Sequence, residues 1–473
     1  MIPQTSLRQT LSDPNLLGNV LGGESWAAWR AILLAAMGER LNPGELEVFR
    51  RLTRRERPPD KRVDELVCVV GRGGGKSSAI AALAVYIAAL CKHKLAPGET
   101  GLVICVAPDQ KQARVCLDYC SGIMEATPLL AGMIANRTAD TLELTNGHCI
   151  EVRSSSFRRL RGFTGLAVIA DEAAFWMSEN STNPDTEILG ALRPALATTG
   201  GLVAIISSPY ARKGELWELY RRHYGPDGDP GILVAQGTSR DFNPELDEKV
   251  VRRALERDES AARAEYFAEF RTDLEGYVAL EEIRACITPG IKERAPENRN
   301  AYVGFTDPSG GTGDSFTLAI MHKEGKVAAL DCVREIRPPF SPEAATAELS
   351  AVLRSYRCSQ VFGDRYAGEW PREQFRKHGI YYEPAEKAKS ELYTDMLPWL
   401  NSRNVDLLDH DRLVMQISGL ERRTGRSGKD SIDHGPGGRD DLANAVAGAL
   451  AMLDRRSSSD FYRELEYPKR AMW

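Results

Sequence analysis

Residues 69–78 read VVGRGGGKSS, a glycine-rich stretch between an apolar run (66–70) and a predicted helix (77–90). A strand–loop–helix of this kind is typical of phosphate binding, because glycines let successive backbone N–H groups turn toward phosphate oxygens. Lys76 would reach the terminal phosphates of ATP, and the hydroxyl of Ser77 would contact Mg²⁺. The pattern normally starts with glycine at position 70, which is valine here, so the loop is a variant. The alternative is a glycine-rich turn without a ligand.

The residues between the first run and the lysine complete this prediction. We expect Arg72, Gly73, Gly74 and Gly75 to take part in binding the nucleotide. Further apolar runs follow at 102–107, 149–152, 166–170, 202–207 and 232–235, with helical stretches between several of them. Continuously apolar runs are typical of strands buried on both faces, so the first half of the chain is predicted to form an α/β domain with a mostly parallel sheet.

Two of these strands end in polar residues that suit ATP hydrolysis. LAVIADEA (166–173) places Asp171 and Glu172 at a carboxyl end, where Asp171 would hold Mg²⁺ through water and Glu172 would orient or deprotonate the attacking water. ISSP (206–209) places Ser207 and Ser208 beside the γ-phosphate. The alternatives are a helix cap for the acidic pair and an ordinary turn for the serines.

An arginine-rich stretch, RRLRGFTG, precedes the acidic strand. Arg161 is a candidate arginine finger that would stabilise the transferring phosphoryl group, and Arg158 and Arg159 are not distinguished from it. The alternative is an arginine that faces DNA or solvent.

The second half of the chain begins with three successive strand candidates, at 301–306, 315–322 and 326–333. Asp307 ends the first strand, Asp364 ends a later one, and Asp440 and Asp441 open the last helix. Converging carboxylates can hold two Mg²⁺ or Mn²⁺ ions for phosphodiester cleavage. Each residue also has a simple structural role as turn former, strand end or helix cap. Either Asp440 or Asp441 could supply the third ligand, and we favour Asp441.

Bulk properties limit the class of protein. The 473 residues carry 61 basic and 66 acidic side chains, a net charge of −5, which argues against a general nucleic-acid coat. No apolar run reaches the roughly 18 residues of a membrane span, and the N-terminus lacks the layout of a secretory signal. The nine cysteines form no Cys-x-x-Cys pair and suit reduced thiols. We therefore expect a soluble, intracellular protein that is not secreted.

In order and spacing, these motifs resemble those of the large terminase subunit of tailed bacteriophages. The resemblance rests on GRGGGKS (71–77), LAVIADEA, ISSP, GFTDPSGGTGDS (304–315), VFGDRYAG (361–368) and GGRDDLANAVAGAL (437–450). It implies an ASCE-type P-loop ATPase that drives double-stranded DNA into a procapsid and an RNase H-like nuclease that cuts concatemeric genomes. It also implies ATP with Mg²⁺ in the first site and two Mg²⁺ or Mn²⁺ ions in the second.

The resemblance also implies partners and an organisation. The partners would be a portal protein, a small terminase subunit and other copies of the chain in a ring, commonly a pentamer, docked at the portal in the host cytoplasm. We expect an N-terminal segment (1–40), an ATPase domain (41–270), a linker (271–298), a nuclease domain (299–455) and a flexible tail (456–473). Arg161 resembles the position proposed to act in trans.

Two departures from the family pattern stand out. The upstream glutamine expected to contact adenine is replaced by Glu45 or Glu47 as candidates, and Arg439 stands where a histidine commonly precedes the paired aspartates. Lys387 and Lys389 are predicted to grip the DNA backbone. The main alternative function is a helicase or repair ATPase fused to a resolvase-type nuclease.

Overall fold

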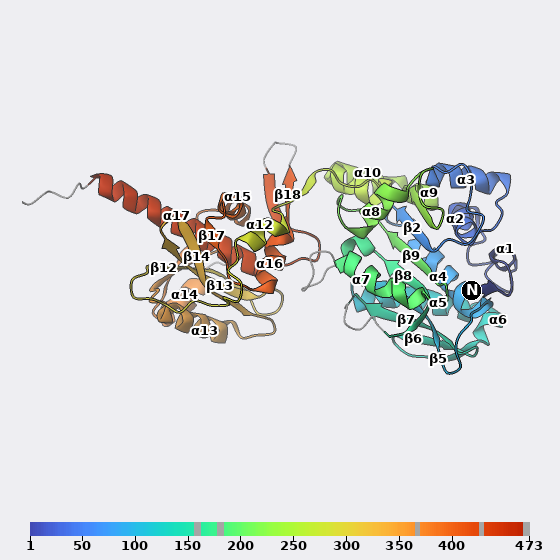
Figure 1. The fold of residues 1–473 in the computed structure, drawn as a ribbon, viewed down its shortest axis with the longest axis horizontal. Helices are drawn as coiled ribbons and strands as arrows, with labels where there is room; N and C mark the ends of the chain where they lie inside the picture. Colours follow the sequence, from blue (N-terminus) through green and yellow to red (C-terminus); the bar gives the residue numbers. More distant parts are fainter. Residues whose placement is uncertain (156–161, 177–183, 365–368, 425–429, 467–473) are drawn as a thin grey trace, which may run out of the picture. The chain divides into compact units, whose positions relative to one another are not determined.

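The computed structural model describes residues 1–155, 162–176, 184–364, 369–424 and 430–466. The chain divides into two compact units, Met1–Thr272 and Asp273–Trp473, and each is described by itself (Figure 1). No helix in these described ranges has the length and apolar character to cross a membrane.

The first unit is built on an eight-stranded sheet with the order β10-β2-β9-β8-β4-β7-β6-β5. The strands from β10 to β7 are parallel to their neighbours, whereas β6 and β5 are antiparallel additions at one edge. In sheet order they are β10 (Ile232–Gly237), β2 (Glu65–Val70), β9 (Leu202–Ser207), β8 (Thr164–Asp171), β4 (Gly101–Ala107), β7 (His148–Ser154), β6 (Thr141–Leu144) and β5 (Ile134–Arg137). A single strand, β9, separates β2, before the glycine-rich loop, from the acidic strand β8. This is the ASCE-type P-loop arrangement that was predicted.

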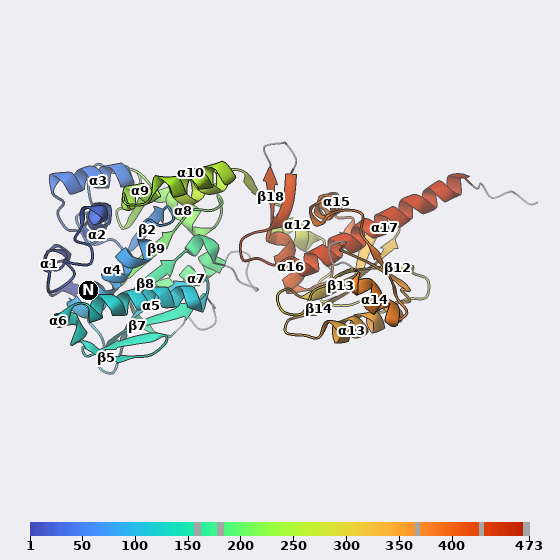
Figure 2. The same ribbon diagram turned by 180° about the vertical axis from the view of Figure 1, so that it is seen from behind.

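Helices cover both faces of this sheet, which explains the continuously apolar strands. Helices α4 and α5 lie on one face of the sheet, and α7 and α8 lie on the other (Figure 2). Leu66 and Cys68 of β2 belong to the core shared with α2, α4 and α5, whereas Val67 and Val69 belong to the core shared with α7 and α8. Both sets are fully buried. The helices of the unit are α1 (Leu7–Ser12), α2 (Ala27–Ala36), α3 (Pro43–Thr53), α4 (Lys76–Leu90), α5 (Gln110–Glu125), α6 (Pro128–Ala131), α7 (Pro184–Leu192), α8 (Gly214–His223), α9 (Ser239–Phe242), α10 (Glu248–Arg257) and α11 (Glu259–Phe267). A short pair, β1 (Ile2–Pro3) with β3 (Cys91–Lys92), ties the N-terminus to the end of α4.

The second unit has a six-stranded sheet with the order β16-β15-β12-β13-β14-β17. The three leading strands form an antiparallel meander, and β15 and β16 continue in parallel from β12, as expected for an RNase H-like fold. The strands are β12 (Tyr302–Asp307), β13 (Phe316–Glu324), β14 (Val327–Ile336), β15 (Gln360–Gly363), β16 (Tyr381–Pro384) and β17 (Val405–Asp406). A separate three-stranded sheet contains β11 (Leu274–Gly276), β18 (Leu420–Thr424) and β19 (Asp430–His434).

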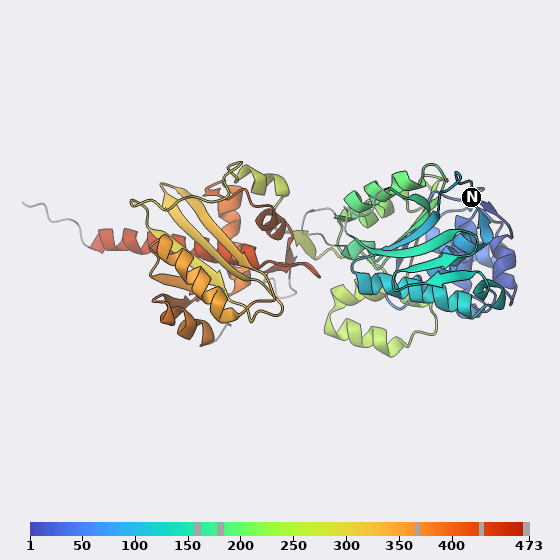
Figure 3. The ribbon, with the colours of Figure 1, turned by 90° about the horizontal axis from the view of Figure 1, so that it is seen from below.

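The six-stranded sheet lies between α13 on one face and α17 on the other (Figure 3). Phe305 faces the α17 side, and Leu318 faces the side on which α13 contributes Leu349 and Leu353. The helices are α12 (Leu280–Ala285), α13 (Pro342–Ser355), α14 (Trp370–Lys377), α15 (Lys389–Asn401), α16 (Asp411–Ser418) and α17 (Asp441–Glu466).

The predicted domain boundaries need correction at three places. Residues 1–40 are part of the first unit, because Trp29 and Ile32 are fully buried in its core. Residues 271–298 are more than a linker, because β11 pairs with β18 and Ile283 of α12 is buried in the core of the second unit. The last helix extends to Glu466, whereas the flexible tail was predicted to begin at residue 456.

Candidate functional sites

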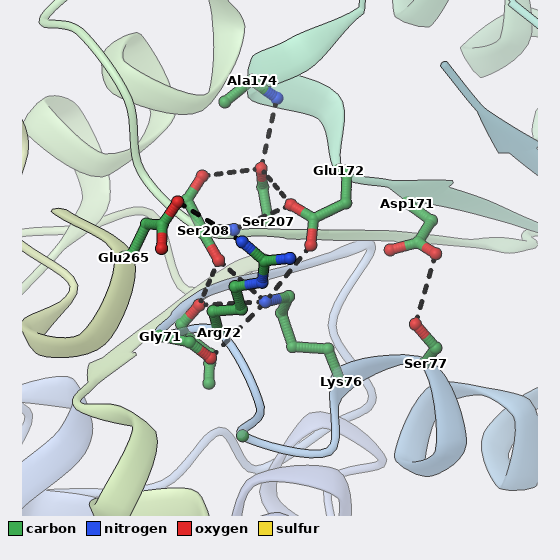
Figure 4. Close-up of polar contacts among 12 residues, drawn as sticks. Gly71, Arg72, Lys76, Ser77, Asp171, Glu172, Ala174, Ser207, Ser208 and Glu265 are labelled. Atoms are coloured by element: carbon green, nitrogen blue, oxygen red, sulfur yellow. Dashed lines mark hydrogen bonds and ion pairs between the residues drawn. The ribbon is translucent and has the colours of Figure 1, made fainter. Parts of the chain in front are cut away.

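The glycine-rich loop lies between β2 and α4, as predicted (Figure 4). Gly73 and Gly75 have φ angles of 77° and 78°, a region that favours glycine. Val70 is the last residue of β2 and is fully buried, so the valine at that position ends a strand and the turn begins one residue later.

Three side chains from outside the loop hold three successive loop carbonyls. The pairs are Arg72 O with Ser239 Oγ (2.6 Å), Gly73 O with Asn243 Nδ2 (2.9 Å) and Gly74 O with Trp29 Nε1 (2.7 Å). A trans peptide points its N–H away from its C=O, so the N–H groups of Gly73 and Gly75 face away from these donors. The loop is thus held in the orientation that presents N–H groups to an anion.

Lys76, at the start of α4, points back over the loop. Its ammonium donates to Ser208 Oγ at 2.9 Å and to the Val70 carbonyl at 3.2 Å, and it lies 3.3 Å from Glu172 Oε1. Only 6% of the Lys76 side chain is exposed. The other oxygen of Glu172 accepts hydrogen bonds from Ser207 Oγ and the Ser208 backbone N–H. The predicted lysine, glutamate and paired serines therefore form one cluster.

Asp171 ends β8 and is buried beside the start of α4. Its Oδ2 accepts from Ser77 Oγ at 3.3 Å, and its Oδ1 has no hydrogen-bond partner among the described residues. Burial, together with the neighbouring Glu172 charge, raises the pKa of Asp171 to about 7. A buried carboxylate oxygen without a donor next to a serine hydroxyl fits Mg²⁺, whose preferred ligands are oxygens.

Two of the residues predicted to contact the nucleotide have other partners in the structure, and a third prediction falls outside the described residues. The Arg72 side chain is 70% exposed and pairs with Glu265 at 3.5 Å. Glu45 caps α3 and pairs with Arg8, which gives it a structural role. Arg161, with its two neighbouring candidates, lies outside the described residues.

In the second unit the predicted carboxylates meet in one cavity of about 670 Å³. Asp307 ends β12 and Asp364 follows β15, and because these strands are parallel neighbours, both aspartates lie at the same sheet edge. Asp440 and Asp441, at the start of α17, line the same cavity. We call Asp307, Asp364 and Asp441 the inner group.

Asp307 and Asn444, which both line this cavity, are hydrogen-bonded to each other. Burial raises the pKa of Asp307 to about 7, and the charges of the nearby aspartates add to the effect. Asn444 Nδ2 donates to Asp307 Oδ2 at 2.8 Å and opposes the shift. Asn444 Oδ1 is buried and has no hydrogen-bond partner in the described parts of the chain. Sequence reasoning missed Asn444, although it lies one helical turn after Asp440 and Asp441 and so shares their face.

The structure separates the two adjacent aspartates. Asp440 Oδ2 accepts from Tyr393 Oη at 2.8 Å and lies 2.9 Å from Lys389 Nζ. Asp441 accepts a longer bond, 3.3 Å, from the Ser315 backbone N–H. Asp440 is therefore already paired with a cation, which favours Asp441 as the third ligand of the inner group.

A chain of contacts supports the Ser315 side of the cavity. Ser315 Oγ donates to Glu335 at 2.9 Å, and Arg412 holds the same carboxylate with two hydrogen bonds. Although burial opposes it, these donors lower the pKa of Glu335. The loop that contacts Asp441 is thus fixed by a buried ion pair.

The predicted DNA contacts and the remaining acidic candidates are also placed. Lys387 pairs with Asp395. Lys389 lines the cavity and pairs with Asp433 and Asp440, which differs from its predicted contact with the DNA backbone. Arg439 donates to the Gly313 carbonyl at the rim. Asp314, Asp433 and His434 line the cavity.

Searches against protein-family models and curated proteins found no match. Solved structures do match. The HK97 bacteriophage large terminase is 13% identical, with a TM-score of 0.38, and the match covers 90% of this chain and 99% of that one. The large terminase ATPase domain of Thermus phage P74-26 is 21% identical over 50% of this chain and 96% of that one, with a TM-score of 0.37. The magnesium-bound large terminase nuclease of thermophilic phage G20c is 16% identical over 36% of this chain and 95% of that one, with a TM-score of 0.33.

These solved structures are of the kind that the motifs resemble. Because the TM-scores are below 0.5 and the identities below 25%, the roles of the residues in this chain rest on its own geometry. That geometry comprises a phosphate-type loop with an acidic strand end in one unit and a converging carboxylate cavity in the other.

Proposed function

We propose that this chain is a terminase large subunit, which couples ATP hydrolysis in the first unit to packaging of double-stranded viral DNA and cuts the DNA with the second. One observation carries the proposal. Two separate sites suited to phosphate chemistry lie on a single chain, the Lys76–Glu172 cluster in one unit and the inner group in the other.

In the ATPase site, the loop N–H groups and the Lys76 ammonium would bind the β- and γ-phosphates. Ser77 and Asp171 would hold Mg²⁺, which when bound offsets the negative charge that develops on the phosphates. Glu172 would orient the attacking water, and Ser207 and Ser208 keep its carboxylate in place. Arg161 of a neighbouring copy would complete the site.

In the nuclease site, the inner group would hold two Mg²⁺ or Mn²⁺ ions, which when bound activate water and stabilise the leaving oxygen. The carboxylate set fits such ions, because it offers hard oxygen ligands and keeps a buried amide oxygen, Asn444 Oδ1, without a donor. Asn444 would keep Asp307 oriented through its 2.8 Å hydrogen bond.

The wider setting belongs to the same proposal. The chain would act in a ring, commonly a pentamer, at the portal of a procapsid in the host cytoplasm, with a small terminase subunit delivering concatemeric DNA. ATP hydrolysis would supply the free energy for packaging.

The experiment measures ATP turnover and cleavage of supercoiled plasmid, with Mg²⁺ or Mn²⁺, on the same preparations. Lys76→Ala should abolish ATP hydrolysis and leave cleavage, and Asp307→Asn should do the reverse. Glu348→Gln, at an exposed position of α13, is the matched control. Cleavage that persists in Asp307→Asn, or turnover that persists in Lys76→Ala, would refute the corresponding half of the proposal.

A further inference from the structure

Beside the inner group lies a second set of potential metal ligands, Asp433, His434 and Asp440, which we call the outer group. One ligand atom from each lies within 4.8 Å of the others. The outer group lines the same cavity as the inner group. Ligand atoms this close together would suit a divalent ion. In the structure, however, another group lies between them.

This group is the ammonium of Lys389. Lys389 Nζ lies 2.9 Å from Asp433 Oδ1 and 2.9 Å from Asp440 Oδ2, and so bridges the two carboxylates. Asp440 is only 8% exposed, whereas Asp433 is 51% exposed. The contact with Asp440 is therefore the one shielded from water, and it satisfies a carboxylate that would otherwise be buried without a cation.

The position of Lys389 is fixed by its surroundings. Lys389 opens α15, and Tyr393, one turn later on the same helix, donates to the same oxygen of Asp440. The next residue, Ser390, accepts a hydrogen bond from the Ile432 backbone N–H at 2.8 Å, which ties the start of α15 to β19. These two contacts fix the start of α15 and thereby hold the Lys389 ammonium between the two carboxylates.

We propose that Lys389 is a built-in cation that takes the place of a further divalent ion in the outer group and thereby confines the metals to the inner group. Six aspartates and three cationic side chains line the cavity. Two divalent ions offset the remaining negative charge and leave one positive charge for a phosphate, and a third ion would be surplus. The confining role rests on the proposed nuclease function, but the occupancy of the outer group does not.

The test counts Mn²⁺ ions bound to the full chain without nucleotide, by electron paramagnetic resonance of the free ion. Lys389→Met should bind one more Mn²⁺ than the wild type, and Lys389→Met combined with Asp433→Asn should lose that ion again. Lys389→Arg should keep the wild-type count. The matched control is Lys387→Met, which removes a neighbouring lysine that pairs with Asp395 alone among the described contacts.

A second measurement guards against misfolding. Mn²⁺ should raise the Tm of Lys389→Met more than that of the wild type, because binding to a site present only in the folded state stabilises it. An unchanged count in folded Lys389→Met would overturn the proposal. So would a lower count in Asp433→Asn alone, because a metal would then already occupy the outer group of the wild type.

The proposed nuclease function is tested separately by Asp307→Asn. A wild-type count that this variant does not lower would count against the inner group as a metal site. The extra ion gained by Lys389→Met would still report on Lys389.

Discussion

Replacing Trp29 by phenylalanine should weaken nucleotide binding although Trp29 is outside the glycine-rich loop. The indole is fully buried and donates to the Gly74 carbonyl at 2.7 Å. Phenylalanine keeps an aromatic ring next to Phe242, whose centroid lies 4.7 Å from that of Trp29, but removes the donor. A buried carbonyl left without its partner costs about 1–3 kcal/mol.

Part of this cost can be relieved if the loop relaxes in the free protein. The loop must then be ordered again when phosphates bind, and the part of the cost that was relieved reappears in binding. If all of the 1–3 kcal/mol is relieved, the Kd of ADP increases by roughly 5- to 150-fold, which is the upper limit of the effect. Calorimetric titration of the full chain with Mg²⁺ and ADP measures it. The effect should be larger on Kd than on the turnover at saturating ATP, because the hydrogen bond that is lost holds the phosphate-binding loop and does not involve Glu172.

Trp217→Phe is the matched control. Trp217 lies on α8 at the opposite face of the sheet, beside Phe270, and loses the same indole volume without a loop contact. If Trp29→Phe lowers the Tm as Trp217→Phe does but leaves the Kd within twofold of the wild type, Trp29 is a core residue only and the reasoning is refuted.

Three further predictions concern the second unit. The folded-state pKa of Asp307, about 7, lies above its unfolded value of about 3.9, so the folded protein retains a proton that the unfolded chain loses. Asp307 therefore contributes stability that is lost as pH rises from about 4 to 7, so in EDTA the Tm of the wild type should fall relative to that of Asp307→Asn over this range; a constant difference in Tm between the two would contradict this. Asn444→Ala should lower Mn²⁺ affinity and plasmid cleavage by about 10- to 100-fold while ATP turnover persists, and undiminished Mn²⁺ affinity by calorimetry would argue against its orienting role. A Cβ at Gly448 of α17 would overlap the Phe305 ring, so Gly448→Ala should cost about 1–3 kcal/mol in urea unfolding, against a helical gain of about 1 kcal/mol. No loss of stability would mean that Phe305 moves aside.

The sequence was sufficient to predict those site residues whose positions depend on the secondary structure directly next to them in the chain. Lys76 and Asp171 follow from a loop and from the carboxyl end of a buried strand, and parallel strands bring such ends to one edge. Asp307 and Asp364 were predicted to meet at one edge of the second sheet, and the structure places them at the ends of the parallel neighbours β12 and β15. All six strands expected in the first half of the chain are present as well.

What escaped prediction depends on contacts between distant segments. Trp29 and Gly74 are 45 positions apart in the sequence, and the residues around Trp29 contain no pattern that predicts their contact. Lys389 was predicted, with nearby basic residues, to contact the DNA backbone, whereas in the structure it pairs with Asp440, 51 positions later and directly before α17. Strands β5 and β6 were missed because β5 has an exposed, polar sequence typical of an edge. Asn243, which binds the Gly73 carbonyl, follows the short helix α9 after β10, and its contact with the loop arises because β10 pairs with β2.

The ion pair between Lys76 and Glu172 has a consequence for the order of events in the proposed ATPase. The glutamate that would act on water is held by the very lysine that a phosphate needs, at 3.3 Å. Arrival of a nucleotide is then an exchange of one anion for another at the ammonium, and this exchange releases the carboxylate. Without a nucleotide, the ion pair would keep the water-orienting carboxylate engaged with Lys76, and the serines that hold its other oxygen would keep it close by when phosphates take its place.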